Sequence, residues 1–291
     1  MDEPNHRSLH KDATPRIGGL GILAGTLVCL TSLTPLLWPV AALACALAVL
    51  SFLDDRGGVP ILIRLSAHFA AASIWVESVD NWPPVLAVLA VLLLVWTTNL
   101  YNFMDGADGL AGGMAVTGFG AYGVAAWLGG QPELSLLCAA VAAASLGFLR
   151  FNFPPAKLFM GDVGSIPLGF LAGAIGLLGW RQGLWTAWFP LLVFSPFVVD
   201  ATLTLLRRMI AGKRFWQAHS DHYYQRLLRM GWSRRRTALA AYALMLASAV
   251  SALWLAHADA ALHLAILSGW ALAYAAFAWR IDSVWRQQGA V

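Results

Sequence analysis

Residues 82–109 read WPPVLAVLAVLLLVWTTNLYNFMDGADG, a long apolar run that changes abruptly into a loop of acids, amides and glycines. An α-helix rises about 1.5 Å per residue, so the apolar part is long enough to cross roughly 30 Å of hydrocarbon. Such runs recur along all 291 residues, of which 59% are hydrophobic and only 12% charged. Soluble domains carry about a quarter charged residues. The composition therefore excludes a soluble enzyme and predicts an all-α, polytopic integral membrane protein.

The apolar runs predict about ten transmembrane helices in a single domain over residues 1–291. The expected ranges are 18–36, 38–53, 61–77, 82–99, 108–128, 134–151, 165–180, 185–208, 235–256 and 261–280. Residues 1–17 are polar and lack the apolar region of a cleavable signal peptide. Cys29, Cys45 and Cys138 lie inside apolar runs and form no Cys-x-x-Cys pair, so neither a disulfide framework nor a zinc site is expected.

Charge distribution predicts the orientation of these helices. If the connections alternate between the two sides, one side holds 18 of the 19 Lys and Arg, and the other holds only Arg181. The positive-inside rule assigns the first side, and with it both termini, to the cytoplasm. Most acids, amides and histidines of the loops fall on the same side. A transporter would be expected to place polar groups near the bilayer midplane, so this asymmetry favours a site at the cytoplasmic membrane surface.

Two loop segments carry carboxylates directly after an apolar run. The first, SFLDDRGG at 51–58, contains adjacent Asp54 and Asp55, which can bind a cation with a phosphate or exchange a proton. The alternative is a solvated helix end before a Gly-Gly turn. The second, NLYNFMDGADG at 99–109, supplies the hard oxygen ligands that Mg²⁺ prefers, although Asp108 could instead cap the next helix.

Two further segments combine other side chains of this kind. The segment NFPPAKLFMGDVGS at 152–165 places an acid between glycines, next to a cation and an aromatic residue that can stack on a base, although Asp162 could also be a helix cap. The segment HSDHYYQRL at 219–227 places His219 and His222 on one helical turn, where they can bind a metal, a sugar or a phosphate.

Three other features of the helices have simpler interpretations. Asp200 lies deep in the eighth expected helix, where an ionised group is costly and is expected to be functional or paired. His68 is expected to be a packing residue outside the site. Gly169 and Gly173 are expected to form a close-packing helix face.

These segments, together with PNHRSLHKDATPRIGG at 4–19, resemble in sequence and order the polyprenyl-phosphate N-acetylhexosamine-1-phosphate transferases of glycosyltransferase family 4. The resemblance covers nearly the whole chain. It implies transfer of a sugar 1-phosphate from a UDP-sugar to undecaprenyl phosphate in the bacterial cytoplasmic membrane, with release of UMP and with Mg²⁺, or Mn²⁺ in its place. The product would be the first lipid-linked intermediate of O-antigen or another cell-envelope polysaccharide.

The resemblance also implies roles for individual residues. The implied catalytic residues are Asp54 as base on the lipid phosphate, with Asp55 and Asp105, and the implied Mg²⁺ ligands are Asn102 and Asp162. The implied substrate-binding residues are Lys11, Thr14, Asn99, Asp108, Asn152, Phe159, Gly161, His219 and His222. Phe159 would stack on uracil and Asp108 would contact the uridine. Both direct displacement and a covalent aspartyl-phosphate intermediate remain open.

Two departures from the family pattern affect these expectations. Family members carry a further transmembrane helix before the Pro-Asn-x-Arg-Ser segment, so either the start lies upstream or this helix is lacking. The pattern His-x-x-His-x-x-Gln at 219–225 is closer to the O-antigen type than to the peptidoglycan translocase. It favours a UDP-N-acetylhexosamine, including 6-deoxy sugars such as N-acetylfucosamine or N-acetylquinovosamine.

The alternatives are the phospho-N-acetylmuramoyl-pentapeptide transferase and, more distantly, a transporter or lipid flippase. The expected partners are the UDP-sugar, the polyprenyl phosphate and the bilayer, without nucleic acid. A homodimer is left open.

Overall fold

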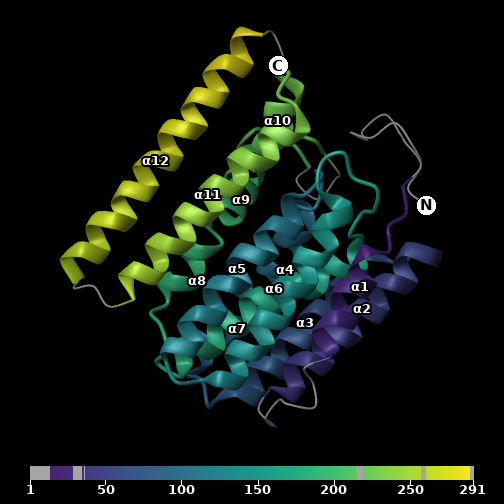
Figure 1. Ribbon diagram of the computed structural model, residues 1–291, viewed down its shortest axis with the longest axis vertical. Helices are drawn as coiled ribbons and strands as arrows, with labels where there is room; N and C mark the ends of the chain where they lie inside the picture. Colours follow the sequence, from purple (N-terminus) through teal and green to yellow (C-terminus); the bar gives the residue numbers. More distant parts are fainter. Residues whose placement is uncertain (1–13, 29–34, 36, 215–218, 257–259, 289–291) are drawn as a thin grey trace.

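The computed structural model describes residues 14–28, 35, 37–214, 219–256 and 260–288, which form an all-helical bundle (Figure 1). Its helices are α1 (Gly18–Leu27), α2 (Trp38–Gly57), α3 (Ile61–Val79), α4 (Pro84–Phe103), α5 (Leu110–Leu128), α6 (Pro132–Asn152), α7 (Asp162–Arg181), α8 (Trp188–Val193), α9 (Ser195–Ile210), α10 (Tyr223–Arg229), α11 (Arg234–Leu255) and α12 (Ala260–Gln287). In Figure 1, the N-terminal helices α1 and α2 and the C-terminal helices α11 and α12 lie on opposite sides of the molecule.

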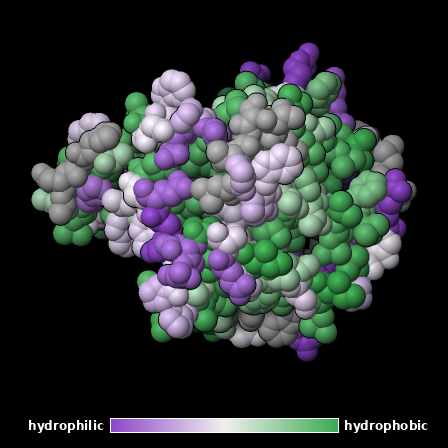
Figure 2. All heavy atoms as spheres, turned by 90° about the horizontal axis from the view of Figure 1, so that it is seen from below, coloured by the Kyte–Doolittle hydropathy of each residue, from purple (hydrophilic) through white to green (hydrophobic). Residues whose placement is uncertain are grey.

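Each of the ten ranges expected from the sequence contains a helix, and the all-α fold class is confirmed. Within the described ranges, α2, α4, α6, α7, α11 and α12 are long and apolar enough to cross a membrane. Apolar side chains such as Leu62, Leu89 and Trp127 are exposed on the outside of the bundle. Figure 2 shows hydrophobic residues over large parts of one face, with a group of hydrophilic residues among them. The protein is therefore a multi-pass membrane protein, and the number of ten crossings stays a prediction.

The eighth expected helix is divided into α8 and α9, contrary to the continuous range 185–208. The division falls at Phe194, and Pro196 occupies the first turn of α9. Proline has no backbone N–H to donate to a preceding carbonyl, so it is suited to the start of a helix and not to its interior. Ser195 Oγ donates to Leu192 O at 2.7 Å, the carbonyl to which Pro196, four residues later, has no N–H to donate.

Helix α7 forms the centre of the bundle and is buried over nearly its whole length. It packs against α4 at Gly169 and Gly173, where an added Cβ would meet Thr97 O and the Thr97 side chain. These glycines are therefore a close-packing face, as expected from the sequence. Because α7 begins at Asp162, this packing fixes the position of that carboxylate at one end of the bundle.

Candidate active site

Carboxylate and amide side chains from four parts of the chain converge at the end of the bundle where α7 begins. Asp54 and Asp55 lie in the last turn of α2, Asn102 in the last turn of α4, and Asp105 in the loop that follows, while Asp162 is the first residue of α7. Asn102 donates a side-chain hydrogen bond to Asp162, and its Oδ1 accepts one from Ser165 Oγ at 2.7 Å. Asp55 accepts from the backbone N–H of Val163. We call Asp54, Asp55, Asn102, Asp105 and Asp162 the acid–amide cluster.

Two arginines border this cluster. Arg64 Nη1 lies 2.5 Å from Asp54 Oδ2 and 3.9 Å from Asp162 Oδ2, and Arg16 Nη2 lies 3.6 Å from Asp162 Oδ1. The second oxygen of Asp54 accepts from Val59 N at 2.6 Å. Among the described residues, the four carboxylates of the cluster thus outnumber the two guanidinium groups that face them.

Burial and the neighbouring carboxylates of the cluster act in the same direction on Asp105. Burial raises the pKa of Asp105 well above its usual range, and the carboxylate of Asp162 and, more weakly, that of Asp55 raise it further. The guanidinium of Arg16 and the backbone N–H of Gly161 act in the opposite direction. Carboxylates that repel one another in this way are neutralised by a bound cation or a proton.

Gly161 holds the approach to Asp162 in a conformation that only glycine adopts easily. Its φ is +72°, and an added Cβ would lie 2.8 Å from Arg16 O and 3.3 Å from Asp55 Oδ2. The segment before it is aligned with residues 15–19, since Phe159 N donates to Pro15 O at 2.8 Å and Gly18 N donates to Phe159 O at 2.9 Å. These backbone contacts bring residues 14–19 next to the cluster.

Asp108 and Asn152 hold the 152–161 loop against the start of α5. Asn152 Oδ1 accepts from Gly109 N at 2.8 Å, and its amide donates to Leu158 O at 2.8 Å. Asp108 Oδ2 accepts from Ala156 N at 3.0 Å and lies 3.1 Å from Arg234 Nη1. The residue preceding α5 is Gly109, so Asp108 bridges two loops and does not cap the helix. Phe159, in the same loop, is half-buried.

Asn99 lies beside His68, a histidine that was expected to be a packing residue outside the site. Its Nδ2 lies 3.3 Å from His68 Nδ1 and donates to Val95 O at 2.7 Å. His68 is buried, as expected of a packing residue, yet it also lines the same cleft as Asp54, Asn102 and Asp162. Its position four residues after Arg64 places both on one face of α3, which is the signal that could have identified it.

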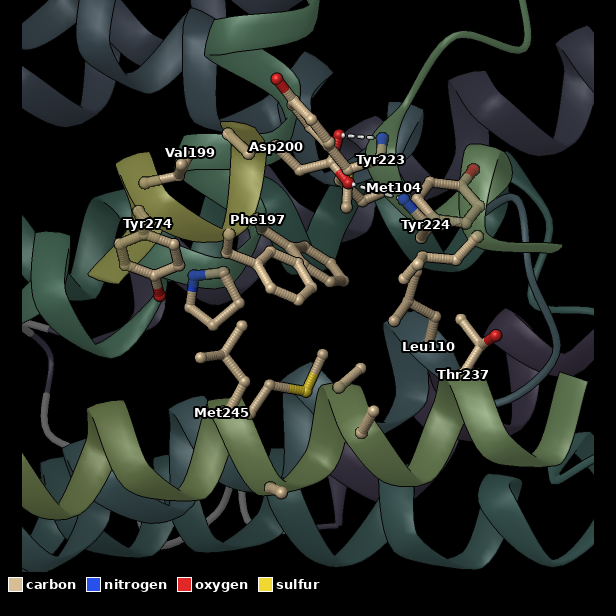
Figure 3. Close-up of a pocket in the computed structure, with 18 of the residues that line it drawn as sticks. Met104, Leu110, Phe197, Val199, Asp200, Tyr223, Tyr224, Thr237, Met245 and Tyr274 are labelled. Atoms are coloured by element: carbon tan, nitrogen blue, oxygen red, sulfur yellow. Dashed lines mark hydrogen bonds between the residues drawn. The ribbon is translucent and has the colours of Figure 1, made fainter. Parts of the chain in front are cut away.

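The histidine segment leads into α10, a short helix between α9 and α11 that begins at Tyr223. His222 is the residue before this helix and His219 lies in the preceding loop, so the expectation that the two histidines share a helical turn is wrong. Their ring centroids nevertheless lie 5.0 Å apart. Asp200 accepts from Tyr223 N at 2.9 Å and from Tyr224 N at 3.1 Å (Figure 3). Asp200 Oδ1 also lies 3.2 Å from His222 Nδ1. Asp200 is therefore paired, one of the two outcomes expected for it, and it holds the start of α10. Burial and the neighbouring His222 lower the pKa of His219 to about 4.

Tyr224 links α10 to the acid–amide cluster. Its hydroxyl donates to Phe103 O at 3.4 Å, and an added Cβ on Gly106 would collide with that hydroxyl. Burial raises the pKa of Tyr224 well above its usual range, and the carboxylates of Asp200 and Asp105 raise it further. The structure thus brings α10 next to the loop that contains Asp105. Thr14 is buried near the start of α1, whereas Lys11 lies outside the described residues.

A cleft of about 440 Å³ extends from the acid–amide cluster between α2, α3 and α4. Its polar end contains Asp54, Arg64, His68, Asn99, Asn102 and Asp162. Its apolar walls include Leu50, Ile61, Leu65 and Leu92, of which the last three are exposed on the outside of the bundle. The cleft therefore has a polar end suited to a phosphate and an apolar side open to hydrocarbon.

Comparison with known proteins assigns the family. Residues 37–179 match glycosyl transferase family 4. A probable undecaprenyl-phosphate N-acetylglucosaminyl 1-phosphate transferase of Bacillus subtilis is 31% identical over 92% of this chain and 80% of its own length. The undecaprenyl-phosphate alpha-N-acetylglucosaminyl 1-phosphate transferase of Escherichia coli K12 is 30% identical over 81% of this chain and 71% of its own length. A phospho-N-acetylmuramoyl-pentapeptide-transferase of Levilactobacillus brevis is 35% identical, but over only 62% of this chain and 55% of its own length. The chain belongs to glycosyl transferase family 4.

Proposed function

We propose that this protein transfers an N-acetylhexosamine 1-phosphate from a UDP-sugar to undecaprenyl phosphate and releases UMP. The observation that carries the proposal is the acid–amide cluster at the polar end of an apolar cleft. This arrangement suits a reaction between a phosphate on a long hydrocarbon chain and a soluble nucleotide sugar. The relatives that match most of the chain are named for such a transfer.

The cleft between α2, α3 and α4 is the proposed site of the acceptor lipid. Its apolar walls would contact the first part of the polyprenyl chain, and burial of apolar surface contributes roughly 25 cal/mol per Å². Arg64 lies at its polar end, where a guanidinium can donate two hydrogen bonds to a phosphate. Asp54 orients Arg64 through their contact and is the candidate base on the lipid phosphate.

The acid–amide cluster fits a Mg²⁺ ion that is shared with the substrate. Across the described ranges, no three His, Cys, Asp or Glu side chains are placed to hold a metal by themselves. Mg²⁺ often binds through one or two carboxylates, with phosphate oxygens and waters completing its octahedron. Asp162 and Asn102 are the proposed ligands, because Asp162 repels its neighbours and the amide of Asn102 fixes its orientation. When bound, the ion would offset charge on the donor pyrophosphate.

The remaining site residues are proposed to position the donor. Phe159 would stack on uracil, and the loop that Asp108 and Asn152 hold in place would surround the nucleotide. His219, neutral above pH 5 because its pKa is about 4, and His222 would hydrogen-bond to the sugar or pyrophosphate. The attacking lipid phosphate is already anionic, so the main task of Arg16 and Arg64 is to reduce repulsion between the two substrates.

The site is proposed to face the cytoplasm of a bacterial inner membrane, since it lies among the loops that hold 18 of the 19 Lys and Arg. Both described ends of the chain would lie on that side. UDP-N-acetylglucosamine is the first donor to test, with 6-deoxy N-acetylhexosamines and the muramoyl-pentapeptide donor as alternatives. The proposed pathway role is the first lipid-linked step of O-antigen or another envelope polysaccharide.

A donor panel tests this proposal. The purified protein is mixed with undecaprenyl phosphate, Mg²⁺ and each UDP-sugar in turn, and UMP release is measured with and without a chelator. We expect release with one N-acetylhexosamine donor, and its loss when the chelator is added. UMP release with only the muramoyl-pentapeptide donor would favour the alternative transferase. No UMP release with any donor would contradict the proposal.

A further inference from the structure

A second polar cavity, of about 760 Å³, lies between α9, α10 and α12. Six cationic side chains line it: Arg207, Arg208, Lys213, Arg226, Arg229 and Arg286. Only two carboxylates accompany them among the described residues, Asp221 in the lining and Asp282 beside it. We call this space the basic cavity. Its charge is opposite to that of the acid–amide cluster.

The pairing inside the basic cavity leaves positive charge uncompensated. Asp282 bridges Arg207 and Arg226 at 2.5 and 2.8 Å, and Asp221 pairs with Arg208. Arg208 Nε is nevertheless buried, and no described group accepts its hydrogen bond. Buried donors without acceptors are rare in folded proteins, and such a donor is usually satisfied by a water or an ion.

An apolar cavity of about 500 Å³ lies next to the basic cavity, between α9, α11 and α12 (Figure 3). Helix α12 contributes to both, with Phe277 lining the apolar cavity and Trp285 lining the basic one. Eight residues separate the two, which corresponds to about 12 Å along a helix. Tyr223 lies between the two cavities. The guanidinium carbons of Arg207 and Arg226 each lie 5.2 Å from the centre of its ring, and its side chain also lines the apolar cavity.

We propose that the two cavities together bind one anionic phospholipid of the surrounding bilayer. Its phosphate head would lie in the basic cavity and its acyl chains in the apolar cavity. Basic pockets between transmembrane helices at the cytoplasmic surface bind such headgroups, and tryptophan prefers the same interfacial depth. The charge complementarity and the 12 Å offset along α12 match a phosphate above hydrocarbon chains.

The occupant is a bulk phospholipid and not the acceptor substrate. Of the described residues that line the two cavities, none belongs to the acid–amide cluster. A polyprenyl phosphate held there would be surrounded by arginines and kept from the proposed Mg²⁺ ligands. The lipid would instead connect α12 to α9 and α10, and α10 is the helix that contacts the loop after α4 through Tyr224.

The test compares lipid retention by two arginine variants. Arg229 and Arg286 are exposed, line the basic cavity and lie outside the proposed catalytic residues. Native mass spectrometry measures binding of phosphatidylglycerol and of phosphatidylcholine with the same acyl chains to the full protein in mild detergent. We expect preferential retention of phosphatidylglycerol, and about a thirtyfold loss of its affinity in the Arg229→Gln/Arg286→Gln double variant. Retention should also fall with added salt.

Matched variants separate the headgroup site from general charge and from folding. Arg280→Gln removes the same charge from an exposed position of α12 that lines neither cavity, and it should retain normal phosphatidylglycerol binding. Arg229→Lys/Arg286→Lys should retain most of the affinity. If the double Gln variant fails to fold, each single variant should still lose about fivefold.

Four results would overturn the proposal: equal retention of both phospholipids, equal loss in Arg280→Gln, tighter retention of undecaprenyl phosphate than of phosphatidylglycerol in competition, or full competition by millimolar inorganic phosphate. The third would assign the cavities to the acceptor, and the fourth to a free anion.

Discussion

Replacement of Asp162 by Asn should separate activity from stability. Asp162 belongs to a cluster of four carboxylates, and its contacts with cations are long, 3.6 Å to Arg16 and 3.9 Å to Arg64. Both arginine side chains are more than one-third exposed. The Asn side chain is isosteric and removes one negative charge from a group of like charges.

The expected change in stability is small because two effects oppose each other. Each long, partly exposed ion pair contributes less than about 1 kcal/mol. The loss of these ion pairs is offset by relief of repulsion, because the Asp162 carboxylate adds to burial in raising the pKa of Asp105. We therefore expect a net change of at most about 1 kcal/mol, which corresponds to a shift in Tm of less than about 3 °C. Turnover should fall between about 10²- and 10³-fold, since a group that stabilises the reacting phosphates is lost.

The assay measures Tm in detergent and UMP release on the same preparations. Asp282→Asn is the matched control, because Asp282 pairs closely with Arg207 and Arg226 far from the acid–amide cluster in the chain. It should show the opposite pattern, a loss of about 1–3 kcal/mol in stability with turnover within threefold of the original protein. A large loss of Tm in Asp162→Asn, or near-normal turnover, would refute the reasoning.

Three further changes test other parts of the account. Phe159→Ala should raise the KM for the donor about tenfold with a smaller change in kcat, and an unchanged KM would remove the stacking role. His219 has a pKa of about 4 in the folded protein against 6.5 when exposed, so the unfolded chain binds more protons between these values and stability should fall as pH drops from 6.5 to 4. His219→Gln should show a shallower fall in Tm over that range, and an identical slope would contradict the assignment. Asp200→Ala should lower the free energy of unfolding by about 1–2 kcal/mol, because Tyr223 N and Tyr224 N lose their acceptor, whereas Asp200→Asn should lose less.

The sequence predicted the long helices well because a continuous apolar run is visible locally, whether the helix lies on the outside of the bundle or at its centre, as α7 does. The break at Phe194 was missed because the apolar run continues through Pro196, and a proline in such a run can also lie inside a helix, as Pro167 does in α7. Helix α10 was also missed as an element, since its stability depends on Asp200, more than 20 residues earlier in the chain.

The candidate site was also predicted only in part from the sequence. Segment order predicted that Asp54, Asn102 and Asp162 belong together, and the structure places them in one cluster. The contact of Asn152 with Gly109 spans 43 residues and follows from how α5 and α6 pack, which periodicity does not encode. His68 was assigned to packing because burial and participation in a cleft have the same sequence pattern. The roles of the individual site residues remain proposals.

Direct detection of the lipid product tests the central claim, because UMP release alone could also arise from hydrolysis of the donor. The protein is incubated with undecaprenyl phosphate, UDP-N-acetylhexosamine and Mg²⁺, and the lipids are analysed by mass spectrometry. The account predicts an undecaprenyl pyrophosphate that carries one N-acetylhexosamine, absent with chelator and absent in Asp162→Asn. UMP formation without this lipid, or equal product in the Asp162→Asn variant, would contradict it.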